Sequence, residues 1–224
     1  ALIQLAVDAC KQEESQLIYV LDIHCNGAAF MGSRRLRDAL EDPQVVKVLH
    51  CCYGDASSLF YAYGIQIAGV FDTGLADCML RGVKSNKQRG LQQVLTHYLG
   101  KDNVSLKHKG QLEHVPRMFE PRPLSLQLFE YAYEDVLLCN RLYIAMSEEL
   151  RERGLLELAF ALSALRTPPI ALPASHPLHR PPTHVTVVVH DLEYHFTVQK
   201  SPDTRAWLPS APLGGESDNF RVRV

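Results

Sequence analysis

The sequence of 224 residues has no apolar run near the roughly 20 residues that a membrane-spanning helix requires. It also has no basic segment ahead of its apolar start, as a secretory signal would have. Its six cysteines show no Cys-x-x-Cys spacing and sit in apolar segments, so we expect free, buried thiols rather than zinc ligands or disulfides. These absences predict an intracellular protein, cytoplasmic or nuclear, with no membrane partner.

The net charge of −2 conceals an uneven distribution of charge along the chain. Residues 81–122 contain nine Lys or Arg against three Asp or Glu, whereas residues 1–80 contain five against ten. A basic segment beside an acidic half is typical of a protein that binds a phosphate backbone near a metal site. A solvated basic face without a ligand is the alternative interpretation.

The length suits one domain of about 150 to 200 residues with an appendage. We assign residues 1–166 to the main domain. Residues 167–183 contain six prolines in seventeen residues and are predicted to be a stiff linker. Residues 184–224 form a small β appendage or a truncated second domain, in which alternating apolar positions predict a hairpin that turns at His190-Asp191.

Hydrophobic periodicity predicts strands first, then alternating strands and helices, then a helical end to the domain. An antiparallel hairpin is expected over residues 1–8 and 16–23, and a buried parallel strand over 45–50. The predicted helices are 34–41, 55–63, 75–81, 88–99, 125–152 and 155–165. This order favours an α/β fold built on a mixed sheet flanked by helices.

Within the stretch Arg122 to Asn140, Tyr131 and Asp135 stand four residues apart. Ser125 follows Pro123 as a helix cap, so the two side chains share one face of a helix. A phenol and a carboxylate can then reach the same small volume. A solvated or capping role for such a pair is the alternative, because this spacing also occurs by chance.

Three stretches together resemble the ribonuclease D-like, DEDDy class of 3′-5′ exonucleases. They are Lys-Val-Leu-His-Cys-Cys-Tyr-Gly-Asp ending at Asp55, Val-Phe-Asp-Thr at 70–73, and Arg-Pro-Leu at 122–124 followed by Tyr131-x-x-x-Asp135. The residues of these stretches are most similar to those of Egalitarian and the exonuclease 3′-5′ domain-containing proteins. The resemblance implies a ribonuclease H-like mixed sheet flanked by helices.

The resemblance also implies a two-metal site that hydrolyses phosphodiesters. Asp55 and Asp135 would be the metal ligands, with Mg²⁺ or Mn²⁺ as the cofactor, because these ions prefer carboxylate oxygens. Tyr131 would orient the attacking water, since a phenol with a pKa near 10 is a poor base at neutral pH. Asp72, in Val-Phe-Asp-Thr, is better interpreted as a structural helix cap.

One departure from the resemblance concerns the first acidic motif. In the family, an Asp-x-Glu pair lies on the strand before the hairpin, and this sequence begins after that place. Asp8 and Asp22 fall at strand ends and are not substitutes for the pair. We therefore expect this chain to bind metal weakly and to cut slowly or not at all.

Single-stranded nucleic acid, RNA before DNA, is the expected partner. The predicted phosphate contacts are basic residues just before the Tyr–Asp helix: Lys101, Lys107, Lys109, Arg117 and Arg122. The alternative to an exonuclease is a catalytically inactive RNA-binding adaptor of a small-RNA or mRNA-handling complex. A third interpretation is an interaction domain whose terminal hairpin pairs with a protein partner or with a second copy of the chain.

Overall fold

The computed structural model describes residues 2–8, 16–100, 119–167, 184–189, 192–200 and 207–212. Of the predicted linker at 167–183, only Thr167 is among these residues. Within the described part of the chain, no helix combines the length and the apolar character needed to cross a membrane.

The chain begins with the expected antiparallel hairpin, formed by β1 (Leu2–Asp8) and β2 (Gln16–Asp22). Leu2 pairs with Asp22 and Asp8 pairs with Gln16, so the two strands are in register from end to end. A helix absent from the sequence prediction, α1 (Ile23–Met31), follows directly and is kinked at Asn26. The predicted α2 (Arg34–Glu41) comes next.

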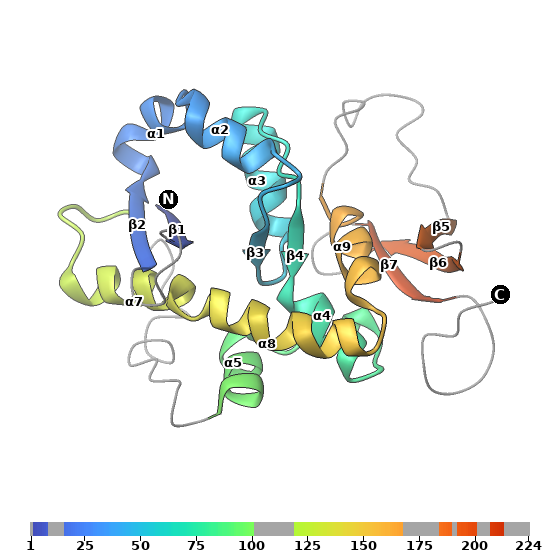
Figure 1. The fold of residues 1–224 in the computed structure, drawn as a ribbon. Coiled ribbons are helices and arrows are strands. Elements are labelled where there is room, and N and C mark those ends of the chain that lie inside the picture. Colours follow the sequence, from blue (N-terminus) through green and yellow to red (C-terminus); the bar gives the residue numbers. More distant parts are fainter. Residues whose placement is uncertain are drawn as a thin grey trace.

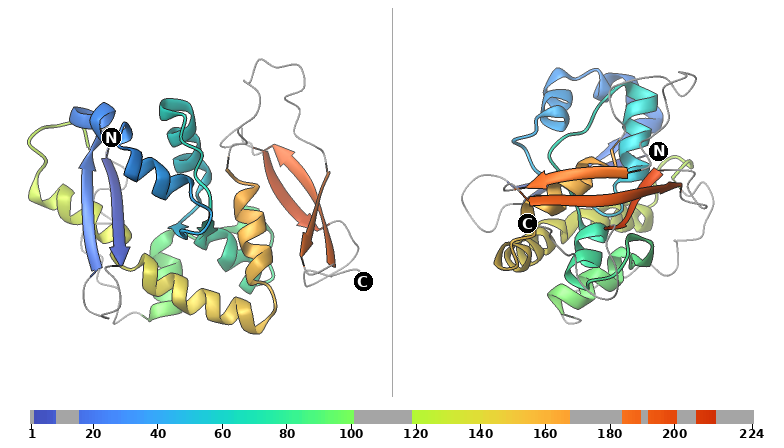
Figure 2. Two further views of the ribbon diagram at one scale, coloured as in Figure 1. Left: turned by 45° about the horizontal axis from the view of Figure 1, so that its top comes forward. Right: turned by 90° about the vertical axis from the view of Figure 1, so that its right-hand side faces the viewer.

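Two strand–helix units follow, β3 (Lys47–Leu49) with α3 (Tyr53–Tyr63), then β4 (Val70–Asp72) with α4 (Thr73–Leu80). β3 and β4 are parallel, as predicted, but β3 is shorter than the expected 45–50 and is half-buried, since Val45 and Val46 are exposed. Among the described strands, β1 pairs with β2 and β3 with β4, which gives two small sheets. Figures 1 and 2 show β1 on the side of the hairpin that faces β3.

Helices from the second half of the domain pack against both small sheets. The later helices are α5 (Leu91–Leu99), α7 (Leu126–Leu137), α8 (Cys139–Glu152) and α9 (Leu156–Ala164), with a short 3₁₀ turn, η1 (Ser85–Lys87), before α5. α7 contacts β1 and β2, α8 contacts β3, and α9 contacts β4. The long helix predicted from Ser125 is divided at Leu138, which lies between α7 and α8, and Cys139 Sγ donates to the Asp135 carbonyl of α7 (3.3 Å).

The larger hydrophobic core lies between β4 and the helices α4, α5, α8 and α9. Phe71 of β4 is fully buried, and its ring packs edge-on against Tyr143 of α8 and Phe160 of α9 at 5.0 and 5.5 Å. A second cluster lies under the hairpin and includes Ile23, Ile65 and Val70. The mixed α/β class expected from the sequence is confirmed.

The C-terminal segment contains one strand more than the predicted hairpin. β5 (His184–Val189) and β6 (Leu192–Lys200) form the expected antiparallel pair, and β7 (Trp207–Pro212) adds to β6. The two prolines in 207–212 argue against a strand at the level of sequence, because proline cannot donate a hydrogen bond to a neighbouring strand and is confined to edge positions. β5 contacts α9, and β7 contacts η1.

We expect α9 to be an integral part of this core. Leu162 is 2% exposed and Leu165 is 39% exposed. Leu162→Ala should lower the free energy of unfolding by about 2–5 kcal/mol, since it leaves a cavity. The matched change Leu165→Ala should cost less than about 1 kcal/mol. Urea titration followed by circular dichroism measures both values, and equal losses would contradict the packing of α9.

Candidate functional site

Asp55 follows a sharp turn between β3 and α3. The turn consists of His50, Cys51 and Cys52, and Cys51 adopts φ +58°, a left-handed conformation unusual for a residue with a Cβ atom. α3 begins after Cys52 and carries Asp55 in its first turn. The sequence predicted this strand–turn–helix arrangement but gave no sign of the strained residue within it.

The carboxylate of Asp72, at the end of β4, binds this turn and the neighbouring helix together. Its Oδ1 accepts hydrogen bonds from the backbone N–H groups of Cys51 (3.0 Å), Gly74 (2.9 Å) and Leu75 (3.2 Å). Its Oδ2 accepts one from the N–H of Cys52 (3.2 Å). Asp72 is therefore the N-cap of α4, as predicted, and it also bonds the start of α3.

Asp72 is 1% exposed, and a buried carboxylate needs a compensating charge. Arg166, 3% exposed and located just after α9, supplies it, with Nη1 at 2.5 Å from Oδ2. The Gln88 amide, with its oxygen oriented toward Arg166, accepts from Nη1 at 2.6 Å and from Nη2 at 3.0 Å. Ser163 Oγ accepts from the Asp72 N–H at 3.0 Å, so α9 holds β4 through two groups.

Asp55 lies in the electrostatic field of this buried cluster. Its side chain is exposed to solvent, whereas Asp72 is enclosed. Desolvation by the surrounding protein, and then the negative charge of Asp72, raise the pKa of Asp55 above its ordinary value. Both effects penalise the charged form of Asp55.

Tyr131 and Asp135 lie on α7, as the four-residue spacing predicted. Tyr131 is 7% exposed, and its ring packs at a tilt against Phe119 with centroids 6.1 Å apart. Asp135, one turn further along, is half-buried. Ser125 caps the helix by accepting from the Leu128 N–H at 3.3 Å. That Asp55 and Asp135 share one site stays a prediction.

Arg122, predicted to contact phosphates, is engaged within the protein. Its Nε and Nη2 form two parallel bonds of 2.6 Å with the carboxylate of Asp22. Its Nη1 donates to the carbonyls of Phe119 (2.7 Å) and Pro121 (2.8 Å). The pair joins the end of β2 to the segment before α7. Asp22 also accepts from the first N–H groups of α1, which explains an acid at this strand end.

The other predicted phosphate contacts, Lys101, Lys107, Lys109 and Arg117, lie outside the described residues, so their assignment stays a prediction. Within the described residues, no group of three or more His, Cys, Asp or Glu side chains is placed so that it could hold a metal ion. Magnesium takes about six oxygen ligands and usually one or two carboxylates per ion. Asp55 and Asp135 therefore do not by themselves complete a two-metal site.

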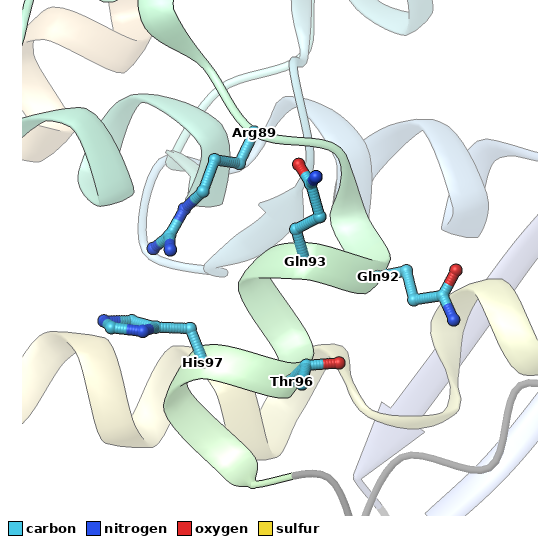
Figure 3. A pocket seen from close by; sticks show the side chains of 5 residues that line it. All are labelled: Arg89, Gln92, Gln93, Thr96 and His97. Atoms are coloured by element: carbon cyan, nitrogen blue, oxygen red, sulfur yellow. The ribbon is translucent and has the colours of Figure 1, made fainter.

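An open polar depression of about 660 Å³ lies along α5, lined by Arg89, Gln92, Gln93, Thr96 and His97 (Figure 3). Its one cationic side chain is already engaged, because Arg89 binds Asp77, which is fully buried. Arg81 and Tyr98 also donate to Asp77. This cluster anchors α5 to α4 and is better explained as structural than as a binding site.

A family model described as 3′-5′ exonuclease matches residues 1–151. The chain belongs to the 3′-5′ exonuclease family. The DEDDy resemblance drawn from Asp55, Val-Phe-Asp-Thr and Tyr131-x-x-x-Asp135 is thereby confirmed at the level of the domain.

A curated relative is the piRNA biogenesis protein EXD1 of Bombyx mori, 25% identical over 138 residues that cover 60% of this chain and 42% of the relative. Among solved structures, RNase D of Trypanosoma brucei is similar with a TM-score of 0.54 and 20% identity, covering 79% of this chain and 62% of that one. A protein from Bifidobacterium adolescentis gives 0.51 and 27%, covering 68% and 34%. The chain thus spans less than two thirds of the relatives it matches.

We expect the pair of Arg122 and Asp22 to make stability depend on pH. The hydrogen bonds from Arg122 hold the pKa of Asp22 well below its ordinary value of 3.8. The unfolded state then binds more protons, so this contribution is present above about pH 4 and is lost as pH falls further. Arg122→Gln should therefore show a smaller fall in melting temperature between about pH 5 and pH 2.

The control is Arg34→Gln, which removes the exposed ion pair with Asp38 on α2. Exposed helix pairs contribute little, so its melting curve against pH should follow that of the unmodified chain. If the melting temperature of Arg122→Gln falls with pH as steeply as that of Arg34→Gln, the link between β2 and the start of α7 is refuted.

Proposed function

We propose that this chain binds single-stranded nucleic acid, RNA in preference to DNA, in the cytoplasm or nucleus, and carries an incomplete 3′-5′ exonuclease site. The observation that carries the proposal is the placement of Asp55. It stands in the first turn of α3, on a turn held by the buried Asp72, at the place where the family resemblance expects a metal ligand. The family match over residues 1–151 supports the reaction class.

Asp55, Asp135 and Tyr131 are the proposed catalytic residues, and the first two are the proposed ligands of Mg²⁺ or Mn²⁺. Such an ion, when bound, would neutralise charge at a phosphodiester and lower the pKa of a bound water. Tyr131 is enclosed against Phe119, which suits a fixed hydrogen-bonding role for its phenol. Because the described carboxylates do not complete the site, we assign no hydrolytic step to this chain alone.

The two small sheets suggest where further carboxylates would enter. Among the described strands, β1 and β3 each pair on one side only, and β1 lies on the side of the hairpin that faces β3. A strand inserted between them would join the hairpin and the β3–β4 pair into one mixed sheet. An Asp-x-Glu pair on that strand would then reach the edge of the sheet where α3 begins.

The test compares this chain with a version extended upstream by a strand that contains Asp-x-Glu. Both are incubated with 5′-labelled single-stranded RNA and Mn²⁺, and products are resolved on a sequencing gel. We expect the extended protein to give a ladder shortening from the 3′ end at least ten-fold faster than this chain, because added carboxylates hold the ions. In the extended protein, Asp135→Asn should reduce the rate by about 100-fold or more.

Asp38→Asn, on the exposed face of α2, serves as the matched carboxylate control and should leave that rate unchanged. If the extended protein releases no nucleotides, or if Asp135→Asn behaves like Asp38→Asn, the catalytic assignment is wrong.

An RNA-binding adaptor without catalysis is the second candidate. It is favoured by the relative from Bombyx mori, whose name places that protein in piRNA biogenesis. In this case the basic segment from Lys101 to Arg117 would bind phosphates, whereas Arg122 would act by holding α7 against β2. A protein partner or a second copy of the chain could then pair with the C-terminal strands.

The adaptor proposal predicts binding that weakens with salt, because phosphate contacts release counterions. The double change Lys107→Glu and Lys109→Glu should weaken binding of a fluorescent single-stranded RNA about ten-fold at low salt. The control pair Arg34→Glu and Arg35→Glu, on α2, should leave the affinity within about two-fold. Fluorescence anisotropy measures both, and unchanged binding by the first variant would exclude the basic segment as the contact.

A further inference from the structure

The buried pair of Asp72 and Arg166 lies next to Asp55, and Asp72 accepts more hydrogen bonds than a helix cap requires. An N-cap carboxylate commonly satisfies one or two N–H groups at the start of its own helix. Asp72 accepts from four, and two of them, at Cys51 and Cys52, belong to a different helix start. One carboxylate therefore fixes the N-terminal ends of α3 and α4 relative to each other.

The turn held by these two bonds is strained. Cys51 has φ +58°, a conformation that persists only where the surrounding structure determines it. Its thiol lies against Gly74, where an added Cβ would come within 2.9 Å of Sγ. The N–H groups of Cys51 and Cys52 point at Asp72, and the imidazole of His50, just before them, is held by Thr73 Oγ1 (2.9 Å) and by the Arg89 carbonyl (3.0 Å). Asp55, three residues beyond Cys52, moves with this turn.

Arg166 lowers the free-energy cost of burying the carboxylate of Asp72. A carboxylate and a guanidinium at 1% and 3% exposure are costly to bury, and removing one partner leaves an uncompensated charge. Among the described residues, the Nε of Arg166 finds no hydrogen-bond partner, whereas Nη1 is directed at Asp72 and both Nη atoms at Gln88. The guanidinium is thus oriented toward the carboxylate even though one of its own donors is left unsatisfied.

We infer that Asp72 and Arg166 are a positioning pair that sets the place of Asp55, so that a residue at the end of α9 controls the geometry of a proposed metal ligand. The meaning of this for catalysis rests on the proposed function. The positioning itself is a property of the fold and is measured separately. Neither residue touches the reacting atoms, and both act through the backbone of Cys51 and Cys52.

The experiment uses the full chain and four variants: Asp72→Asn, Arg166→Met, Arg166→Lys and, as a control, Arg81→Met. Arg81 partners Asp77, another buried carboxylate on α4, so its loss destabilises the same core without touching the turn before α3. Amide hydrogen exchange is followed residue by residue by NMR. Mn²⁺ is then titrated in, and broadening of the Asp55 amide resonance reports binding at that carboxylate.

We expect Asp72→Asn and Arg166→Met to raise exchange at Cys51 and Cys52 roughly ten-fold or more above the level in Arg81→Met, because buried hydrogen bonds are lost locally. Arg166→Lys, which keeps the charge, should restore most of the protection. The Mn²⁺ concentration for half-broadening at Asp55 should rise several-fold in Arg166→Met and return toward the original value in Arg166→Lys.

Exchange at Cys51 and Cys52 that matches the Arg81→Met control would overturn the positioning pair. So would unchanged Mn²⁺ broadening in Arg166→Met when the unmodified chain does bind the ion. If the unmodified chain shows no broadening at Asp55 at any Mn²⁺ concentration, the proposed metal ligand is wrong. In that case the exchange data still decide whether Asp72 and Arg166 hold the turn.

Discussion

The position of the candidate site depends on the groups that hydrogen-bond and neutralise the buried carboxylate of Asp72. Asp72 ends β4, begins α4, and bonds the turn that leads into α3. Its burial is tolerable because backbone N–H groups and a guanidinium hydrogen-bond both of its oxygens. The two strand–helix units are therefore held to each other by polar contacts that lie beside two apolar clusters.

Local patterns in the sequence were sufficient to predict most of the elements. α2 begins and ends where its periodicity indicates, Gly64 closes α3 in the left-handed conformation, and Ser125 caps α7. Each of these features depends on residues within about one helical turn of one another. The predicted cap at Asp72 was also confirmed, since its bonds to Gly74 and Leu75 are local.

Interactions between distant residues could not be predicted in this way. Arg122 was assigned to phosphate binding because it lies in a basic segment, yet its partner Asp22 is one hundred residues earlier. Arg166 is ninety-four residues beyond Asp72, and no spacing rule connects them. A charge count along a sequence does not separate cations that face solvent from cations that neutralise a buried acid. Only the folded contacts distinguish the two.

The position of Arg166 limits where the chain can be cut without removing contacts of this domain. The family model matches residues 1–151, which excludes α9 and the arginine beyond it. A fragment cut at that boundary would keep Asp72 but lose its counter-ion, together with Leu158 and Leu162 of the core. The contacts of the core and of the buried ion pair therefore reach residue 166, beyond the residues that the family model matches.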